Sequence, residues 1–253
     1  MKYLKSKILN FPNIKHAFSL RVDGVSPKPW DSLNCSYFVG DNEKNVKINR
    51  KKVLNNLGFK KSFYINQVHG GKVVNAAYHF NKNKIIEADA IICENYDLPI
   101  TLTTADCAPI LFADPIKGII GAAHAGWRGA IEGITDNLID RFYRKGSNPK
   151  NIHVAIGPCI GKESFEVKDD MISIALQKDS ESEKFFNQIS TLYYFDLPGY
   201  LLSKITSKGI FNVGWIGVDT FKNPQKFFSY RNEAQNNNIV TGRMISVIGL
   251  TKT

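Results

Sequence analysis

Cysteine is scarce in this chain, and none of it is arranged in pairs. The 253 residues include four cysteines, which lie far apart and form no CxxC motif. With 43% hydrophobic residues, a chain of this length can bury a core of its own. A disulfide framework is therefore not expected, and the cysteines are predicted to be free thiols or metal ligands.

Long hydrophobic runs are also missing. No run approaches the roughly 20 apolar residues that a membrane-spanning helix needs. The initial segment MKYLKSKILNF carries charge without the apolar stretch of a signal peptide. No Pro/Gly/Ser-rich linker and no internal repeat divides the chain. We therefore expect a cytoplasmic protein, monomeric or homodimeric, with one domain over residues 1–253 and no membrane partner.

Acidic residues are outnumbered by basic ones. The formal net charge is +10 at pH 7, and the isoelectric point is about 9.3. Such a balance is typical of proteins that bind nucleic acid or another polyanion. The lysines are scattered, however, and no nucleic-acid motif occurs, which favours a solvated surface and no nucleic-acid partner. A small phosphorylated or phosphate-like substrate would also suit a positive field.

Hydrophobic periodicity predicts both helices and strands. Helices are predicted over 41–58, 131–142, 169–178 and 196–209, with end signals at Gly58, Asp196 and Gly209. Strands are predicted over 14–20, 62–70, 72–78, 88–93, 98–104, 151–161 (running into a loop), 211–218, 226–231 and 239–250. The two kinds of element do not alternate strictly. The predicted fold class is therefore α+β: a single domain with mixed β-sheets packed together and covered by helices.

The segment 103–129 is mostly apolar but contains several reactive side chains. Two strand-like runs in it flank the turn sequence DPIK. A turn centred between Pro115 and Ile116 would place Cys107 directly opposite His124. Opposed side chains of an antiparallel pair share one face, with Cβ atoms about 4.5–5.5 Å apart. This register predicts that the two residues form either a catalytic Cys–His pair or two ligands of one metal.

A zinc site needs a further ligand. Zinc takes imidazole nitrogen and thiolate sulfur in a tetrahedron, and a catalytic zinc keeps one position open. His69 is the candidate, because it lies in NQVHGG, where a predicted strand meets a Gly-Gly turn. Sequence context alone leaves open whether His69 is a ligand or an ordinary loop histidine. His16, His79 and His153 are expected to be core or surface histidines.

The motif HAGWRGA follows the hairpin and is predicted to open a helix. Gly126 and Gly129 would let the backbone approach a ligand, and helix N–H groups together with Arg128 would bind an anion. The alternative is a turn that needs its glycines, with Trp127 in the core. Both interpretations stay open at this point.

Three other residues also have two interpretations. Cys159, in GPCIG, is expected to be a buried and inert thiol, with a nucleophile or pocket wall as the alternative. Asp89 and Asp106 are either carboxylates that orient ligand histidines or ordinary aspartates of a turn and a strand end.

Several of these motifs together resemble those of the laccase-domain family. This family was once described as polyphenol-oxidase-like and is now regarded as purine nucleoside phosphorylases. The matching segments are NQVHG, EADA, TTADCAPILFAD, GAAHAGWRG, GPCIG with FEV, and FFSYR with TGRM. The N-terminal segments LRVDGVS, DSLN and VGD also resemble its opening loop. The resemblance thus runs from Arg21 to the last predicted strand, and the chain is identified on these motifs as a bacterial member.

The resemblance implies a single-domain α+β fold and a zinc site made by His69, Cys107 and His124. It implies phosphorolysis of adenosine, inosine and methylthioadenosine to the base and ribose 1-phosphate, and hydrolytic deamination of adenosine. The expected partners are a purine nucleoside and phosphate. Copper, from an earlier oxidase assignment, is less expected, because a multicopper oxidase needs many histidines and this chain has five.

Catalytic roles are expected for Cys107, His124 and Arg128, the last as the cation that holds phosphate. Substrate contacts are expected in the family's motifs, at Arg21, Asn34, Gln67 and Arg231. The chain departs from the family pattern at Asp219, commonly cysteine, and at Asn232, commonly arginine. These departures concern substrate detail near the C-terminal strands. No HxE motif of the zinc nucleobase deaminases occurs, so the general acid/base stays unassigned.

Other functions stay open as alternatives. One is a metal-free hydrolase with Cys107 as nucleophile and His124 as base, since the family's fold resembles that of toxin deamidases with a Cys–His pair. Another is a hydrolase that edits peptidoglycan precursors carrying a wrong amino acid, to which bacterial members are linked. The last is a basic, non-enzymatic binding protein.

Overall fold

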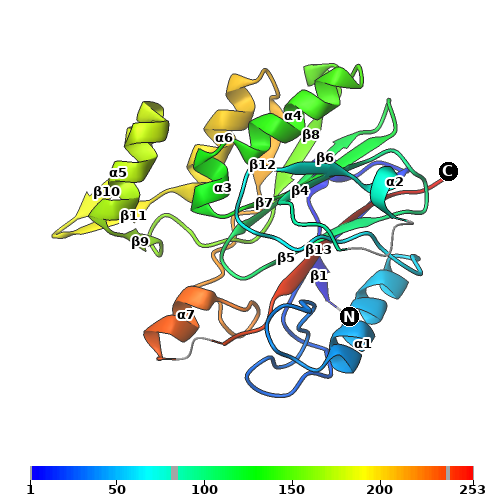
Figure 1. Ribbon diagram of the computed structural model, residues 1–253, viewed down its shortest axis with the longest axis horizontal. Coiled ribbons are helices and arrows are strands. Elements are labelled where there is room, and N and C mark those ends of the chain that lie inside the picture. Colours follow the sequence, from blue (N-terminus) through cyan, green and yellow to red (C-terminus); the bar gives the residue numbers. More distant parts are fainter. Residues whose placement is uncertain (1, 81–84, 238–239, 253) are drawn as a thin grey trace.

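The computed structural model describes residues 2–80, 85–237 and 240–252. Its strands are β1 (Tyr3–Leu4), β2 (Ile14–Ser19), β3 (Val73–Asn75), β4 (Ala90–Cys93), β5 (Ile100–Thr104), β6 (Ala108–Asp114), β7 (Ile119–Ala125), β8 (His153–Ile156), β9 (Glu166–Val167), β10 (Phe186–Ile189), β11 (Leu192–Phe195), β12 (Asn212–Trp215) and β13 (Met244–Leu250). They form a six-stranded sheet, β12-β8-β6-β7-β4-β3, a four-stranded sheet, β1-β2-β13-β5, and a small sheet, β10-β11-β9 (Figure 1). The six-stranded sheet is mixed, because β12–β8 and β3–β4 are parallel pairs and the other pairs are antiparallel.

The α-helices are α1 (Glu43–Asn56), α2 (Ala76–His79), α3 (Trp127–Ile131), α4 (Ile134–Arg144), α5 (Asp169–Lys178), α6 (Leu197–Ser207) and α7 (Tyr230–Gln235). Short 3-10 helices cover Lys7–Leu9, Pro149–Asn151 and Ser180–Phe185. In the described part of the chain, no helix has the length and hydrophobicity needed to cross a bilayer. The α+β prediction, with mixed sheets covered by helices, is confirmed.

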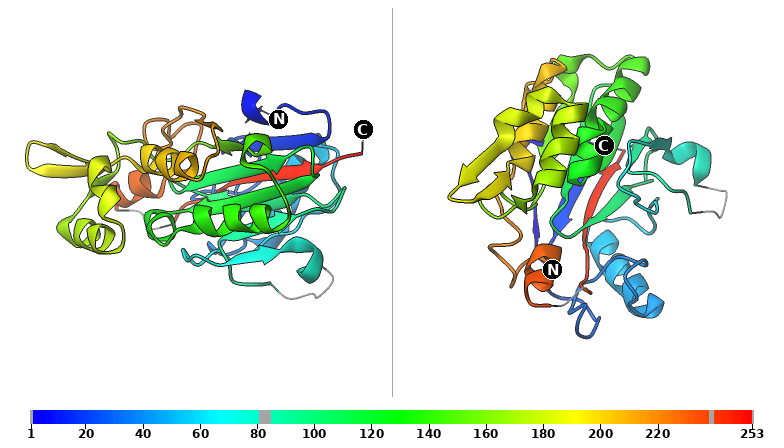
Figure 2. Two further views of the ribbon diagram at one scale, coloured as in Figure 1. Left: turned by 90° about the horizontal axis from the view of Figure 1, so that it is seen from above. Right: turned by 60° about the vertical axis from the view of Figure 1, so that its left-hand side comes forward.

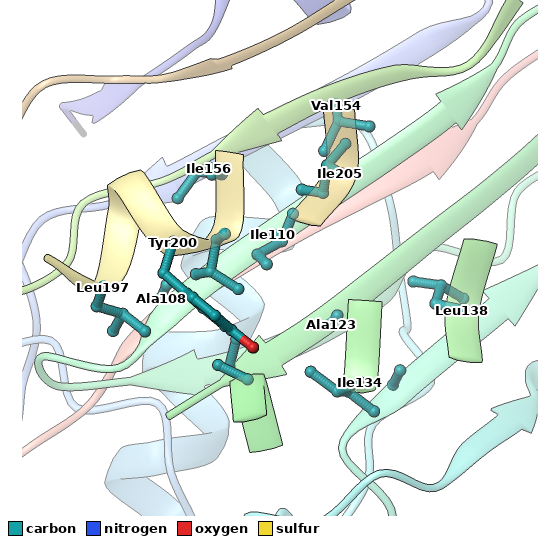
Figure 3. Packing of buried hydrophobic residues seen from close by; sticks show 14 of the residues in the cluster. Ala108, Ile110, Ala123, Ile134, Leu138, Val154, Ile156, Leu197, Tyr200 and Ile205 are labelled. Atoms are coloured by element: carbon teal, nitrogen blue, oxygen red, sulfur yellow. The ribbon is translucent and has the colours of Figure 1, made fainter. Parts of the chain in front are cut away.

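The elements stack in four layers. Helices α4 and α6 cover one face of the six-stranded sheet, the four-stranded sheet packs on its other face, and α1 covers the far side (Figure 2). Figure 3 shows the first interface, where Ile134 and Leu138 of α4 and Tyr200 of α6 face Ile110 and its neighbours. Burial of apolar surface between layers is the main force that stabilises such a stack.

The position of β6, β7 and β13 between layers explains their composition. Every residue of these three strands is buried. A strand covered on both faces needs apolar side chains at consecutive positions rather than at alternate ones. The apolar run of the hairpin is therefore a consequence of sandwiching, and any polar side chain within it stands at the end of a covered strand.

Helix ends are the elements that the sequence predicts best. The Asn42 side chain accepts a hydrogen bond from the Lys44 backbone N–H and begins α1, and Gly58 follows the helix at φ +82°. Asp196 accepts from the backbone N–H of Gly199 at 2.9 Å and begins α6, and Gly209 ends it at φ +79°. These local signals act through neighbouring atoms only, so they need no tertiary context.

One predicted strand ends early and another is wrong, because in each a side chain starts a helix. In 72–78, β3 ends at Asn75, whose side chain accepts from Ala77 N–H and begins α2. In 226–231, Ser229 accepts from the backbone N–H of Asn232 and begins α7. In both places a polar side chain satisfies free helix N–H groups, which outweighs the strand preference of the aromatic residues nearby.

One other predicted strand is absent, and the last one is shorter than expected. Segment 62–70 forms only isolated bridges, at Phe63 and Asn66, instead of a strand. The strand predicted over 239–250 is β13, confined to Met244–Leu250. Its predicted first residue, Ile239, lies outside the described residues.

His16, on β2, is buried as a neutral imidazole. The residue is 3% exposed, and its Nε2 accepts a hydrogen bond from the Ser6 backbone N–H at 2.9 Å. Burial, aided by the charge of Lys5, lowers its pKa from 6.5 to about 4. The unfolded chain therefore takes up a proton at this position at a higher pH than the folded protein does.

We predict that acid destabilises the wild-type protein more than the His16→Gln variant. The stability due to neutral His16 is complete above pH 6.5 and is lost as the pH falls toward the folded-state pKa of about 4. This loss amounts to roughly 3 kcal/mol of unfolding free energy between pH 7 and pH 4. Urea titrations at the two pH values measure it. An equal loss in the variant would contradict the assignment.

Candidate metal centre

The predicted register of the β6–β7 hairpin is wrong. Pro109, rather than Cys107, stands opposite His124. The connection is longer than expected, because residues 115–118 all lie in the turn, which Asp114 closes by accepting from the backbone N–H groups of the second and third of them. Side chains in a strand alternate with a period of two, so a shift of two positions leaves Cys107 toward the same face as His124.

Three donor side chains nevertheless meet at this end of the hairpin. His69 lies in the loop before β3 at φ +62°, Cys107 directly precedes β6, and His124 is on β7. One ligand atom from each of the three residues lies within 4.8 Å of the other two. The two imidazole rings pack edge to face, with centroids 4.7 Å apart. A loop, the residue before β6 and the next-to-last residue of β7 thus bring together three side chains that could hold a metal ion.

Asp89, which precedes β4, orients two of these donors. Its Oδ1 lies 2.8 Å from His124 Nδ1, which leaves Nε2 for a ligand or a proton. The same carboxylate accepts backbone N–H bonds from Val68, His69 and Gly70. Burial raises the pKa of Asp89, but the bond to His124 and the backbone bonds from Gly70 and His69 outweigh burial and lower that pKa. Asp89 therefore has the orienting role rather than that of an ordinary turn aspartate.

The two histidines have opposite pKa shifts. Burial and the nearby His124 lower the pKa of His69, which favours the neutral form that a metal requires. For His124, burial also favours the neutral form, but Cys107 and Asp89 outweigh it and raise the pKa to about 9. A positive charge on the His124 ring, beside Cys107 and the buried Asp89 carboxylate, is thus stabilised, and a metal ion would replace that proton.

The donor set fits a zinc ion. Two imidazoles and one thiol are the ligands that zinc prefers, and three protein ligands leave one position free for a reactant. Space for an ion depends on Gly126: a Cβ atom there would lie 2.7 Å from His69 Nδ1 and 3.1 Å from Cys107 Sγ. Copper also binds such donors. Within the described residues, however, this is the only group of three that could hold an ion, whereas a multicopper centre needs several.

We predict that Gly126→Ala weakens zinc binding by about 10- to 100-fold, comparable to the loss of a ligand-orienting group. Backbone strain contributes nothing, because Gly126 has φ −72°, which alanine adopts freely. The cause is crowding of the His69 and Cys107 donors by the added methyl group. Competition with a chromogenic zinc chelator measures the affinity. In the matched control, Gly70→Ala, the new Cβ meets Asp89 Oδ2 at an ordinary 3.8 Å. Equal zinc affinity in the two variants would contradict the steric account.

A cavity of about 420 Å³ opens directly beside the three donors. Its aromatic and polar walls come from the loop before α1, the segment before β3, the β5–β6 connection, α3, the segment before β9, and α7. The aromatic residues among them are Phe38, Trp127, Phe165 and Tyr230. The size and the mixture of apolar wall with convergent polar groups are typical of a small-molecule site.

Three arginines line this cavity: Arg128, Arg231 and Arg243. Arg128 stacks on the Trp127 ring at 4.3 Å, and among the described residues no hydrogen bond or ion pair engages its guanidinium. Arg231 donates to Glu166 O, and Arg243 donates to Thr241 O and Gly242 O. Burial lowers the pKa of Arg243. These three cationic side chains give the cavity a positive lining that suits an anionic ligand.

Asp106, at φ +83°, is the only acidic residue among the described residues that line the cavity. Its carboxylate accepts from the Thr220 hydroxyl at 2.7 Å, from the Ser229 hydroxyl at 3.0 Å and from the Arg231 backbone N–H at 2.7 Å. Asp106 therefore does not orient a histidine. Because Asp106 directly precedes Cys107, these hydrogen bonds hold Thr220, Ser229 and Arg231 next to the segment that contains this donor.

Two of the residues expected to bind substrate do not line the cavity. The Arg21 guanidinium donates to Asp31 O and Pro224 O and stacks on Phe228. Asn34 is fully buried, and its Oδ1 accepts from the Arg243 backbone N–H. Both residues shape the loops around the site instead of contacting a ligand in the cavity.

The other expected residues do line it. Arg231 faces the cavity, as does Gln67. Both polar ends of the Gln67 carboxamide are engaged by the backbone of Thr103. Gln67 thus joins the loop that contains His69 to β5. It also lines the cavity, with its polar atoms already bonded to Thr103.

Sequence reasoning missed Arg243 and the aromatic wall. Arg243 lies in TGRM, which was used only as a family motif, and nothing in its local sequence distinguishes it from a surface arginine. The departure at Asp219 has a structural explanation: its carboxylate accepts from the Ser164 hydroxyl at 2.6 Å and from the Phe221 backbone N–H. Asp219 therefore closes its own loop. Cys159 beside it is fully buried, and burial raises its pKa far above the ordinary value, as expected of an inert thiol.

The chain is similar to several known proteins. The model of the family described as multi-copper polyphenol oxidoreductase laccase matches residues 15–251. A protein of Rickettsia prowazekii named purine nucleoside phosphorylase RP494 is 37% identical over 192 residues, which are 75% of this chain and 78% of that one. A purine nucleoside phosphorylase of Deinococcus radiodurans is 33% identical over 249 residues, covering 97% of this chain and 93% of its own.

The fold also has a solved relative. The crystal structure of Neisseria meningitidis protein NMB0706 superposes on this chain with a TM-score of 0.89 at 31% identity, and the match covers 100% of both chains.

Proposed function

This chain belongs to the family described as multi-copper polyphenol oxidoreductase laccase, and from that premise we propose that it is a zinc-dependent purine nucleoside phosphorylase. Its substrates would be adenosine, inosine or methylthioadenosine together with phosphate, and adenosine deamination would be a second activity of the same site. The names of its relatives in Rickettsia and Deinococcus support phosphorolysis.

One observation carries the proposal: a single cavity joins the donors His69, Cys107 and His124 to three arginines. Phosphorolysis needs a nucleoside and an inorganic anion side by side. The aromatic walls suit a purine base, and the guanidinium groups suit phosphate. The negative charge of Asp106 is already compensated by its hydrogen bonds from Thr220, Ser229 and Arg231.

In the proposed reaction, a phosphate oxygen forms a bond to C1′ of the ribose while the bond from C1′ to the purine nitrogen breaks. The base leaves with the bonding electron pair and is then protonated. Arg128, which has the least engaged guanidinium, would hold phosphate, and Trp127 beneath it would fix the direction of approach. Asp89 keeps the His124 ring oriented by accepting at Nδ1. Zinc, held by the three donors, would supply a Lewis acid for an oxygen of the reactants.

The decisive experiment incubates zinc-loaded protein with adenosine in the presence and absence of phosphate. We expect adenine and ribose 1-phosphate only when phosphate is present, and inosine as the product of deamination. Chromatography of the bases and an enzymatic assay of the sugar phosphate identify the products. Adenosine that stays unchanged under both conditions would overturn the proposal.

A second candidate function is favoured by the arrangement of Cys107, His124 and Asp89. His124 interacts with the Cys107 thiol on one side and with the Asp89 carboxylate on the other, the arrangement of a thiol nucleophile, its base and the group that orients the base. This would be a metal-free hydrolase. Metal analysis after purification without added metal separates the two, because about one zinc per chain, lost together with activity, supports the phosphorylase.

A further inference from the structure

A second cavity, of about 660 Å³, lies away from the metal donors. Its lining comes from the N-terminal segment with β1, from Leu20 directly after β2, from Asn56 at the end of α1 and from the loop 217–227 that follows β12. None of its lining residues lines the first cavity, so the two spaces are separate. Neither the family resemblance nor the proposed reaction gives this space a ligand.

The lining of the second cavity combines two free cations with an apolar floor. Lys2 and Lys226 are exposed at its edge, and among the described residues no carboxylate or carbonyl engages either ammonium group. Leu4, Leu20 and Phe227 form the floor, and no described lining residue is acidic. Ammonium groups above an apolar floor recognise a ligand with negative charge at one end and apolar surface at the other.

We propose that this cavity binds a small organic anion, a phosphate or carboxylate that carries an apolar group. The anionic end would lie between the two lysines. The apolar end would cover the floor and remove its hydrophobic surface from water. The ligand needs both an anionic and an apolar part. A contact with an exposed lysine alone contributes little binding free energy, and an open apolar cavity alone does not select one ligand over another.

A ligand in the second cavity would affect the first cavity indirectly, because the two cavities share a hydrophobic cluster. Leu20 and Phe227 of the floor belong to one hydrophobic cluster with Ala105, Phe228 and Met244. Ala105 lines the first cavity and directly precedes Asp106. An occupant of the second cavity would therefore contact a hydrophobic cluster that also includes Ala105 of the first cavity.

The loop between the cavities has two faces. One face contributes Asn223, Lys226 and Phe227 to the second cavity. On the other face, Thr220 donates a hydrogen bond to Asp106, as does Ser229 just beyond the loop. A ligand that contacts the first face stabilises the loop in the conformation that holds Asp106 and, through it, the backbone of Arg231.

Calorimetric titration of the zinc-loaded protein with phenyl phosphate tests the site. We expect Lys226→Glu to weaken one binding event by about tenfold or more, because a charge-assisted contact is lost and a repulsive charge is added. The matched control is Lys222→Glu: Lys222 lies in the same loop but pairs with Glu163 outside the cavity. Arg128→Gln, in the first cavity, should leave that event unchanged.

Hydrogen–deuterium exchange supplies the second measurement. Phenyl phosphate should slow amide exchange in segment 217–231 of the wild type and of Lys222→Glu, but not of Lys226→Glu. Equal binding by the two lysine variants would overturn the proposal. So would loss of the Lys226-dependent event in Arg128→Gln, which would place the probe in the first cavity. These measurements do not involve turnover, so their outcome does not depend on whether the protein catalyses the proposed phosphorolysis.

Discussion

Replacing His124 with alanine is expected to lower kcat/KM for phosphorolysis of adenosine by at least about 10³-fold. Loss of the imidazole removes one of three metal donors and with it the several kcal/mol of charge stabilisation that a metal ion contributes to a transition state. It also leaves the carboxylate of Asp89, which is fully buried, without its partner at 2.8 Å. Steady-state kinetics and zinc content are measured together, and both should fall.

Because His124 is buried, the variant could also lose stability, so a second substitution is needed. His69 is exposed, and His69→Ala should give the same loss of zinc and activity while the thermal unfolding midpoint stays close to that of the wild type. The control is His79→Ala on α2, a histidine that does not line the cavity. Wild-type turnover by a correctly folded His124→Ala or His69→Ala protein would refute the role of the metal centre.

Replacing Arg128 with glutamine is expected to lower kcat/KM for phosphate by about 10²- to 10³-fold, the effect typical of losing one preorganised charge-stabilising donor. Formation of inosine, which uses water instead of phosphate, should change only a few-fold. Phosphate-dependence curves measured at saturating adenosine separate these effects. The difference follows from the site, where Arg128 is the arginine with no hydrogen bond to the described residues and is free to bind an anion.

Two controls define the role of the Arg128 guanidinium. Arg128→Lys keeps the charge but loses the planar fork, so it should recover only part of the activity. Arg144→Gln removes an exposed arginine near the end of α4 and should leave the phosphate dependence unchanged. A parallel fall of phosphorolysis and deamination in Arg128→Gln would show that this residue acts on the nucleoside or on folding instead of on phosphate.

The pairing of Cys107 with His124 shows how far sequence reasoning reaches. The residues were expected to share a face, and they do lie together, although the hairpin register is displaced. The result survives because the displacement equals two positions, the period of side chains along a strand. The turn length was the uncertain quantity, and it depends on the Asp114 carboxylate, which closes a longer loop.

The substrate residues show where such reasoning ends. Arg21 and Arg243 are both arginines of family motifs, yet only Arg243 lines the cavity. Arg21 is turned away by the carbonyl of Pro224 and the ring of Phe228, which are about 200 residues distant in sequence. No local pattern contains that contact, so no local pattern predicts it.

The sequence by itself determined the α+β class and the helix ends at Gly58 and Asp196, because capping residues act through near neighbours in the chain. Of the three candidate donors, Cys107 and His124 followed from the hairpin pattern, whereas His69 followed from the family resemblance. The tertiary structure alone decided which arginines line the cavity and which groups hydrogen-bond to Asp106. It alone also placed a second cavity behind Ala105. These features arise where layers of the fold bring distant segments together, and their energies come from burial and charge in a shared space that a linear pattern does not describe.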